Sequence, residues 1–136
     1  MKLDYAKGAT PLHSDDMKGL IPNLTTQQEL NEFEYLNIEQ AMLWAERNRT
    51  MKARLLSVAG IQLLHRKMFD QTWEWAGKFR LHDTNIGVAW QHIPPSVKQL
   101  VDDAIFWLEH ETYALPEVAV RFHHKLVLIH PFPNGN

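Results

Sequence analysis

Hydrophobic side chains recur every three or four residues in four separate stretches of the chain, and polar or turn-forming residues divide these stretches. Such spacing places the apolar side chains on one face of a helix. We therefore expect helices over about residues 26–48, from residue 57, after residue 95 and from residue 116. Their apolar faces contain, in chain order, Leu30, Phe33, Ile38, Ala41 and Trp44; Ile61, Leu64, Met68 and Phe69; Val97, Leu100, Val101, Ala104, Ile105 and Leu108; and Val118, Phe122, Leu126 and Ile129. The pattern predicts a mainly α fold.

Start signals support these helices. Thr26 and Glu29 have the spacing of a capping box, in which hydroxyl and carboxylate each accept a hydrogen bond from the other residue's backbone N–H. Ser57 is a suitable first cap for the second helix. Proline fits the first turn of a helix, where no N–H donor is needed, and Pro95 and Pro116 stand at two such positions.

Two segments lack the helical pattern. Residues 1–24 are rich in Gly, Pro and Asp and are predicted to form an extended arm or loops, so the domain proper is expected over residues 25–136. Residues 79–90 have β-prone ends and a turn-like centre, which favours a short β-hairpin.

Composition restricts the class of protein. The 136 residues, 45% hydrophobic and 22% charged, suit one globular domain. A net charge of −2 argues against a dedicated nucleic-acid binder. The absence of cysteine excludes disulfides, thiol nucleophiles and thiolate metal sites, and it fits a cytoplasmic protein. Neither a signal peptide nor an apolar run of roughly 20 residues is present, so no membrane partner is expected.

The richest chemistry lies in residues 130–136, HPFPNGN, directly after the apolar run that ends at Ile129. Gly135 readily takes positive φ, and Asn134 and Asn136 tolerate left-handed conformations, so the turn can present N–H groups to an anion. His130 can accept a proton near neutral pH. A helix end with a capping histidine and a Pro-Asn-Gly turn explains the same residues without any chemistry. Residues alone leave both interpretations open.

Residues 129–136 resemble the active-site motif of the Fic (Fic/Doc) family, H-x-F-x-D/E-G-N-G/K-R. Residues 64–69 and 73–80 resemble the family's LHxxMF and WAGxxR segments, and residues 84–87 stand where the family has a target-docking flap. Residues 120–126 are similar to the helix that leads into the motif. The resemblance covers about residues 25–136 and is nearest to a subgroup of bacterial mobile-element Fic proteins called mobile mystery protein B.

The resemblance implies a Fic-like helical domain with a small β-hairpin flap. It also implies transfer of AMP from ATP to a Ser, Thr or Tyr hydroxyl of a target protein. His130 would be the general base, Phe132 would anchor the loop, and Asn134, Gly135 and Asn136 would hold phosphates. The flap that docks the target would comprise Thr84, Asn85, Ile86, Gly87 and Val88.

Two departures from the motif alter these expectations. Asn134 replaces the family's acidic Mg²⁺ ligand, and an amide is a weaker ligand for this hard cation. Transfer of another phosphate-containing group is therefore an alternative. The motif's arginine and the helix after it do not follow Asn136, so we expect a C-terminally incomplete domain with impaired catalysis and exposed apolar surface that favours self-association.

The sequence does not decide how the protein is inhibited or whether it is catalytic. Residues 25–30 match only the first part of the family's inhibitory motif, S/T-x-x-x-E-G/N, so a separate antitoxin-like partner is the expected inhibitor. A non-catalytic module that binds a partner protein through the flap is the alternative from another class. His123, His124 and His130 do not share one helical face, so a metal cluster there is not favoured.

Overall fold

The computed structural model describes residues 1–136, except for the side chain of Lys52. The fold is mainly helical, as predicted, and its described residues contain no β-strand beyond an isolated bridge between Leu20 and Trp73. In chain order the elements are α1 (Ser14–Met17), α2 (Gln27–Arg47), α3 (Arg49–Arg54), α4 (Val58–Phe69), the 3₁₀ turn η1 (Trp90–His92), α5 (Ile93–Glu109) and α6 (Leu115–Ile129).

The predicted helix starts are confirmed. The Thr26 hydroxyl accepts a hydrogen bond from the Glu29 backbone N–H, and the Glu29 carboxylate accepts one from the Thr26 N–H, which completes the capping box of α2. Ser57 caps α4 by accepting from the Gly60 N–H at 2.9 Å. Prolines occupy the first turns of α5 and α6. The short helix α3 was not predicted.

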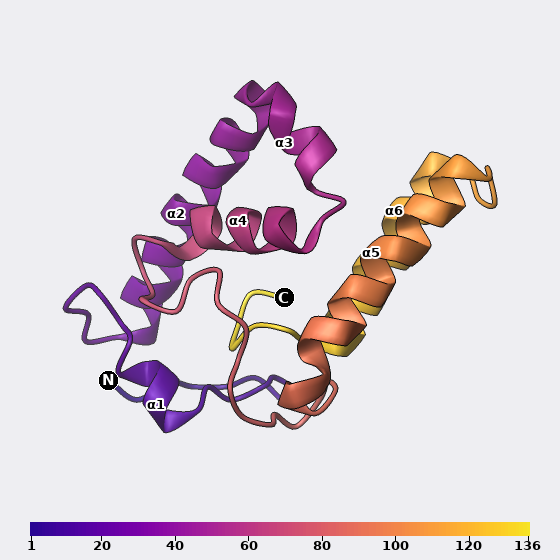
Figure 1. Ribbon diagram of the computed structural model, residues 1–136. Coiled ribbons are helices and arrows are strands. Elements are labelled where there is room, and N and C mark those ends of the chain that lie inside the picture. The colour runs from indigo at the N-terminus through magenta and orange to yellow at the C-terminus, as the bar shows by residue number, and fades with distance from the viewer.

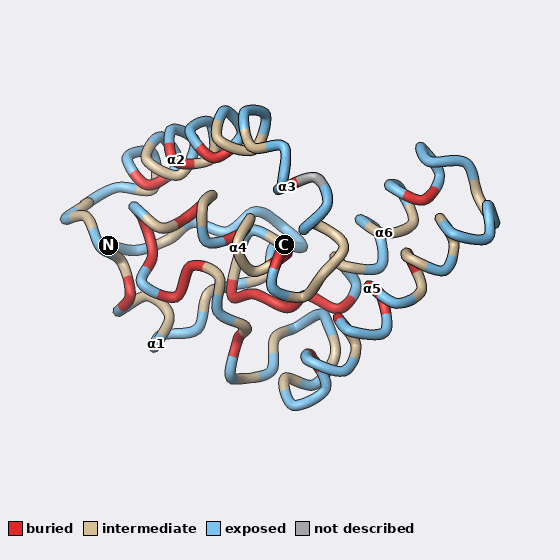
Figure 2. The backbone as a smooth tube through the Cα atoms, turned by 45° about the horizontal axis from the view of Figure 1, so that its top comes forward, coloured by how far each residue is buried: buried red, intermediate tan, exposed pale blue. Residues whose placement is uncertain are grey.

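The helices form two groups with the C-terminal loop between them. Helices α2 and α4 lie against each other, and α5 and α6 form an antiparallel pair that extends to one side (Figure 1). One apolar core joins α4, α5, α6 and Phe132, and a second joins α2, α4 and the tryptophan-rich segment after α4. Figure 2 shows the exposed turn between α5 and α6 far from these cores. The terminal loop is therefore held at the junction of both groups.

The predicted β-hairpin over residues 79–90 is wrong. This segment is a loop with bends and contains no paired strands. Its backbone groups bond elsewhere: the Arg80 N–H donates to the Pro131 carbonyl at 2.9 Å, and the Val88 N–H donates to the Ile129 carbonyl at 3.2 Å. Because the two edges of the segment bond to the C-terminal loop, they cannot form a ladder with each other.

The N-terminal segment, predicted as extended or looped, contains the short helix α1 and packs closely on the domain. Leu3, Leu12, Met17, Leu20 and Leu24 contact the second core. Backbone hydrogen bonds from Ile21 to Thr72 and from Glu74 to Gly19 fix it beside the tryptophan-rich segment. We call residues 3–12 of this segment the arm.

Among the described residues, no helix combines the length and the apolar character needed to cross a membrane.

Candidate active site

His130 stands at the point where α6 ends and the chain turns back into the domain. Its backbone is left-handed, with φ 53° and ψ 62°, and its N–H still donates to the Leu126 carbonyl at 3.0 Å. A left-handed residue of this kind reverses the chain after a helix, and a residue other than glycine adopts it at some cost. The surrounding contacts must therefore hold His130 in place, and Arg80 provides one of them.

Arg80 is 2% exposed and donates to four carbonyl oxygens. Its Nε reaches the His130 carbonyl at 2.6 Å, Nη1 reaches that of His82 at 2.9 Å, and Nη2 reaches those of Val88 and Ile129. The planar guanidinium suits this fixed fork of acceptors. Arg80 thus ties the flap segment and the end of α6 into one unit around His130.

The environment of His130 keeps its imidazole neutral. Burial lowers the pKa of His130, and the positive charge of Arg80 lowers it further. Asn136 Nδ2 lies 3.3 Å from His130 Nε2, and an amide nitrogen only donates, so Nε2 carries the lone pair. Among the described residues Nδ1 has no hydrogen-bond partner. Nε2 is therefore the atom able to accept a proton.

Phe132 anchors the loop in the core, as predicted. It is 2% exposed and belongs to the first core, and its ring stacks on His65 of α4 at 3.7 Å between centroids. His65 Nε2 donates to the Asn134 carbonyl at 2.9 Å, while Nδ1 accepts from the Gly77 N–H at 2.9 Å. Burial lowers the pKa of His65 to about 4, so it is neutral and can serve both partners.

The last two residues give the loop its shape. Gly135 has φ 71°, and a Cβ there would lie 2.3 Å from the Phe69 ring, so no side chain fits. The Asn136 side chain accepts from the Phe132 N–H at 2.7 Å and donates to the Phe132 carbonyl at 2.9 Å. Asn136 therefore closes the loop, because both ends of its side-chain amide bond to the Phe132 backbone.

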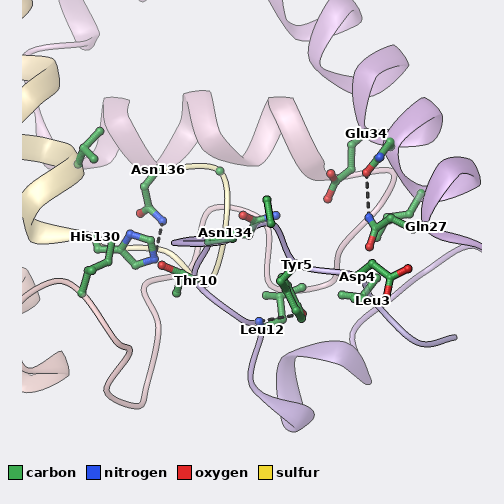
Figure 3. Close-up of a pocket in the computed structure, with 17 residues that line it drawn as sticks. Leu3, Asp4, Tyr5, Thr10, Leu12, Gln27, Glu34, His130, Asn134 and Asn136 are labelled. Carbon is green, nitrogen blue, oxygen red and sulfur yellow. Dashed lines mark hydrogen bonds between the residues drawn. The ribbon is translucent and has the colours of Figure 1, made fainter.

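A cavity of about 450 Å³ lies between the arm, the first turns of α2 and the C-terminal loop (Figure 3). His130, Asn134, Gly135 and Asn136 all line it, so the structure brings the predicted loop residues together. The remaining lining residues are Leu3, Asp4, Tyr5, Ala6, Ala9, Thr10, Leu12, Gln27, Leu30, Asn31, Glu34, Ile86 and Val127. The arm thus forms one wall of the candidate site.

The predicted flap residues do not all face this cavity. Ile86 lines it, and Asn85 Nδ2 donates to the Ala9 carbonyl of the arm at 3.4 Å. Gly87 has φ 99° and sits so close to His130 that a Cβ would meet the His130 Cβ at 2.7 Å. Val88 packs against the first core, and the Thr84 hydroxyl donates to the Ile86 carbonyl. Residues 84–88 thus form a closed loop that packs against His130, the candidate catalytic residue.

A family model described as Fic/DOC family matches residues 55–136, more than half of the chain. The chain belongs to the Fic/DOC family. It is also similar to the probable protein adenylyltransferase y4lH of Sinorhizobium fredii (strain NBRC 101917 / NGR234), with 28% identity over 122 residues. This alignment covers 84% of the chain and 61% of the relative, so the chain spans less than two thirds of that relative's length.

The side chains of the C-terminal loop, residues 130–136, which we call the Fic loop from here on, do not form a set of ligands that suits Mg²⁺. Asn134 offers one neutral amide oxygen, whereas Mg²⁺ prefers carboxylates and phosphates. Asp4 and Glu34 line the same cavity, but the described residues contain no group of three His, Asp or Glu side chains able to hold a metal. The Glu34 carboxylate accepts from Trp73 Nε1 at 2.7 Å, and burial raises its pKa.

Sequence reasoning missed the positioning roles of His65 and Arg80 in this Fic domain. Neither side chain has an unusual local context, and their contacts with the end of α6 and the C-terminal loop lie 49–69 residues away in the chain. The available signal was their place in the LHxxMF and WAGxxR segments. The position of residues 3–12 beside the C-terminal loop was also missed, because no pattern within the predicted N-terminal arm or loops indicated it.

Proposed function

We propose that this chain carries the active site of a protein adenylyltransferase, which transfers AMP from ATP to a side-chain hydroxyl. The observation that carries the proposal is the neutral, buried His130, whose Nε2 lone pair borders the cavity lined by the Fic loop. The family membership and the similarity to a probable protein adenylyltransferase support it.

The step follows from the position of the base. The target hydroxyl gives its proton to His130 Nε2 as its oxygen attacks the α-phosphorus, and the bond from this phosphorus to the pyrophosphate oxygen breaks. Asn136 yields its weak 3.3 Å contact with Nε2 to the incoming hydroxyl. A base in hydrogen-bond reach and a fixed geometry account for most of such catalysis.

The negative charge of the phosphates has to be stabilised chiefly by backbone N–H groups of the C-terminal loop. Neither lysine nor arginine lines the cavity among the described residues, and two carboxylates do. None of the hydrogen bonds found in the described part of the chain uses the backbone N–H of Asn134, Gly135 or Asn136. These three donors are thus available to an anion. Because the residues do not fit Mg²⁺, no step is assigned to a metal.

Transfer of a different phosphate-containing group is the second candidate, and Asn134 is the observation that favours it. An amide in place of the motif's carboxylate weakens metal binding at the phosphates and therefore permits another position of the nucleotide.

The proposed function has three further parts, which rest on the resemblance to Fic proteins alone. They are membership of the mobile mystery protein B subgroup, a cytoplasmic location and an antitoxin-like inhibitory partner.

Labelled ATP tests the proposal. The chain is incubated with bacterial lysate and ATP labelled at the α-phosphate, and protein-bound label is measured after electrophoresis. His130→Ala should abolish labelling, whereas His124→Ala, an exposed histidine on the same helix, should retain it. Label from the γ-phosphate instead of the α-phosphate would favour the second candidate. Equal α-labelling by wild type and His130→Ala would show that His130 is not the base.

A further inference from the structure

The arm, which lines the candidate site, is fixed by apolar packing at both ends and by hydrogen bonds within it. Leu3 and Leu12, at either end of the arm, are partly buried and pack against the second core. The Tyr5 hydroxyl accepts from the Leu12 N–H at 3.0 Å, and the Ala9 N–H donates to the Ala6 carbonyl at 3.0 Å. These contacts close residues 3–12 into a compact loop whose middle faces the Fic loop.

The flap segment contacts the middle of this loop. Asn85 Nδ2 donates to the Ala9 carbonyl, one residue before Thr10. Proline at position 11 disfavours the helical conformation at Thr10 and so favours an extended backbone there. An extended segment held through its main chain beside the flap has the arrangement expected of a bound peptide.

Thr10 is the hydroxyl that this arrangement brings to the base. Thr10 and His130 line the same cavity, and Figure 3 shows their side chains turned toward each other at one end of it. The other side-chain hydroxyl in the cavity lining, that of Tyr5, is held in place by the Leu12 N–H, from which it accepts a hydrogen bond. The Thr10 hydroxyl takes part in none of the hydrogen bonds found among the described residues.

We propose that the arm is an internal target and that Thr10 accepts AMP from the site of its own chain. This inference rests on the proposed adenylyltransferase function and names one substrate of it. The Thr10 Oγ1 attacks the α-phosphorus of ATP, His130 Nε2 takes the hydroxyl proton, and pyrophosphate leaves. Because the arm is already held at the site, attack within one chain avoids the entropy cost of collecting a separate target.

Modification would also change access to the site. A phosphodiester on Thr10 adds a negative charge to a wall that already contains Asp4 and Glu34 and no cation among its described residues. Repulsion and added bulk should displace the arm and open the cavity to another target. Self-modification is therefore expected to precede transfer to other proteins.

The test combines site mapping with matched variants of the full chain. Wild type is incubated with ATP labelled at the α-phosphate, alone and with lysate, and the modified residue is located by peptide mass spectrometry. Thr10→Val keeps the shape of the side chain and removes the hydroxyl, Thr10→Ser restores the hydroxyl, and Thr112→Val is a control in the exposed turn between α5 and α6.

We expect AMP on residue 10 in wild type, Thr10→Ser and Thr112→Val, and its loss in Thr10→Val and His130→Ala. The modified fraction should not depend on protein concentration, and a tagged His130→Ala chain mixed with wild type should stay unlabelled. Label on another residue of the chain, or label that passes to the tagged chain, overturns the proposal.

Two further outcomes separate this inference from the function on which it rests. Label on lysate proteins with none on residue 10 overturns the internal target and leaves AMP transfer standing. Absence of label from every protein overturns both.

Discussion

Replacing Arg80 with lysine tests how the C-terminal loop is held. Lysine keeps the positive charge, but its single ammonium cannot span the four carbonyl oxygens that Arg80 reaches. Two buried carbonyls would then lose their donor, and each loss costs about 1–3 kcal/mol, so Arg80→Lys should lower the free energy of unfolding by about 2–6 kcal/mol. With a urea dependence of about 2 kcal/mol per molar, the unfolding midpoint should fall by about 1–3 M.

Urea unfolding followed by tryptophan fluorescence measures this change. Arg121→Lys is the matched control, because Arg121 is a half-exposed arginine paired with Glu117 one turn earlier in α6, and its ion pair should contribute less than about 1 kcal/mol. A second variant, Arg80→Met, removes the positive charge as well as the hydrogen-bond donors. The pKa of His130, followed by NMR, should therefore rise in Arg80→Met and stay closer to the wild-type value in Arg80→Lys. If Arg80→Lys unfolds at the same urea concentration as Arg121→Lys, the hydrogen bonds from Arg80 to the four carbonyl oxygens do not stabilise the loop.

Three further predictions concern the loop and its supports. Gly135→Ala should cost about 3 kcal/mol from positive φ and the clash with Phe69, whereas Gly8→Ala, also at positive φ but with open space around it, should cost only about 1–2 kcal/mol; equal costs would contradict the clash. The pKa of His65 is about 4 when folded and about 6.5 when unfolded, so its contribution of about 3 kcal/mol is present above pH 6.5 and disappears as the pH falls toward 4. Unfolding measured across this range should lose that pH dependence in His65→Gln, and an unchanged pH profile would refute the assignment. Thr26→Ala should destabilise the protein by about 1 kcal/mol in thermal unfolding through loss of the α2 cap, and a neutral result would show that the cap is redundant.

Local signals predicted the helices well because each depends on neighbouring residues. The capping box at Thr26 and the prolines at the starts of α5 and α6 act within one turn, and the apolar stripes need only some partner to pack against. The hairpin prediction failed because residues 79–90 had another source of hydrogen-bond partners, the C-terminal loop about fifty residues later. Propensity cannot foresee such competition.

The sequence by itself determined the helical elements, the Fic motif and the chemical identity of the loop residues, because all of these are properties of short segments. Only the tertiary structure decided which carbonyls Arg80 holds, that burial keeps His130 and His65 neutral, and that Thr10 of the arm lines the same cavity as His130. These features come from contacts between segments far apart in the chain, and the desolvation and fixed distances that give them their chemistry exist only after those segments pack together.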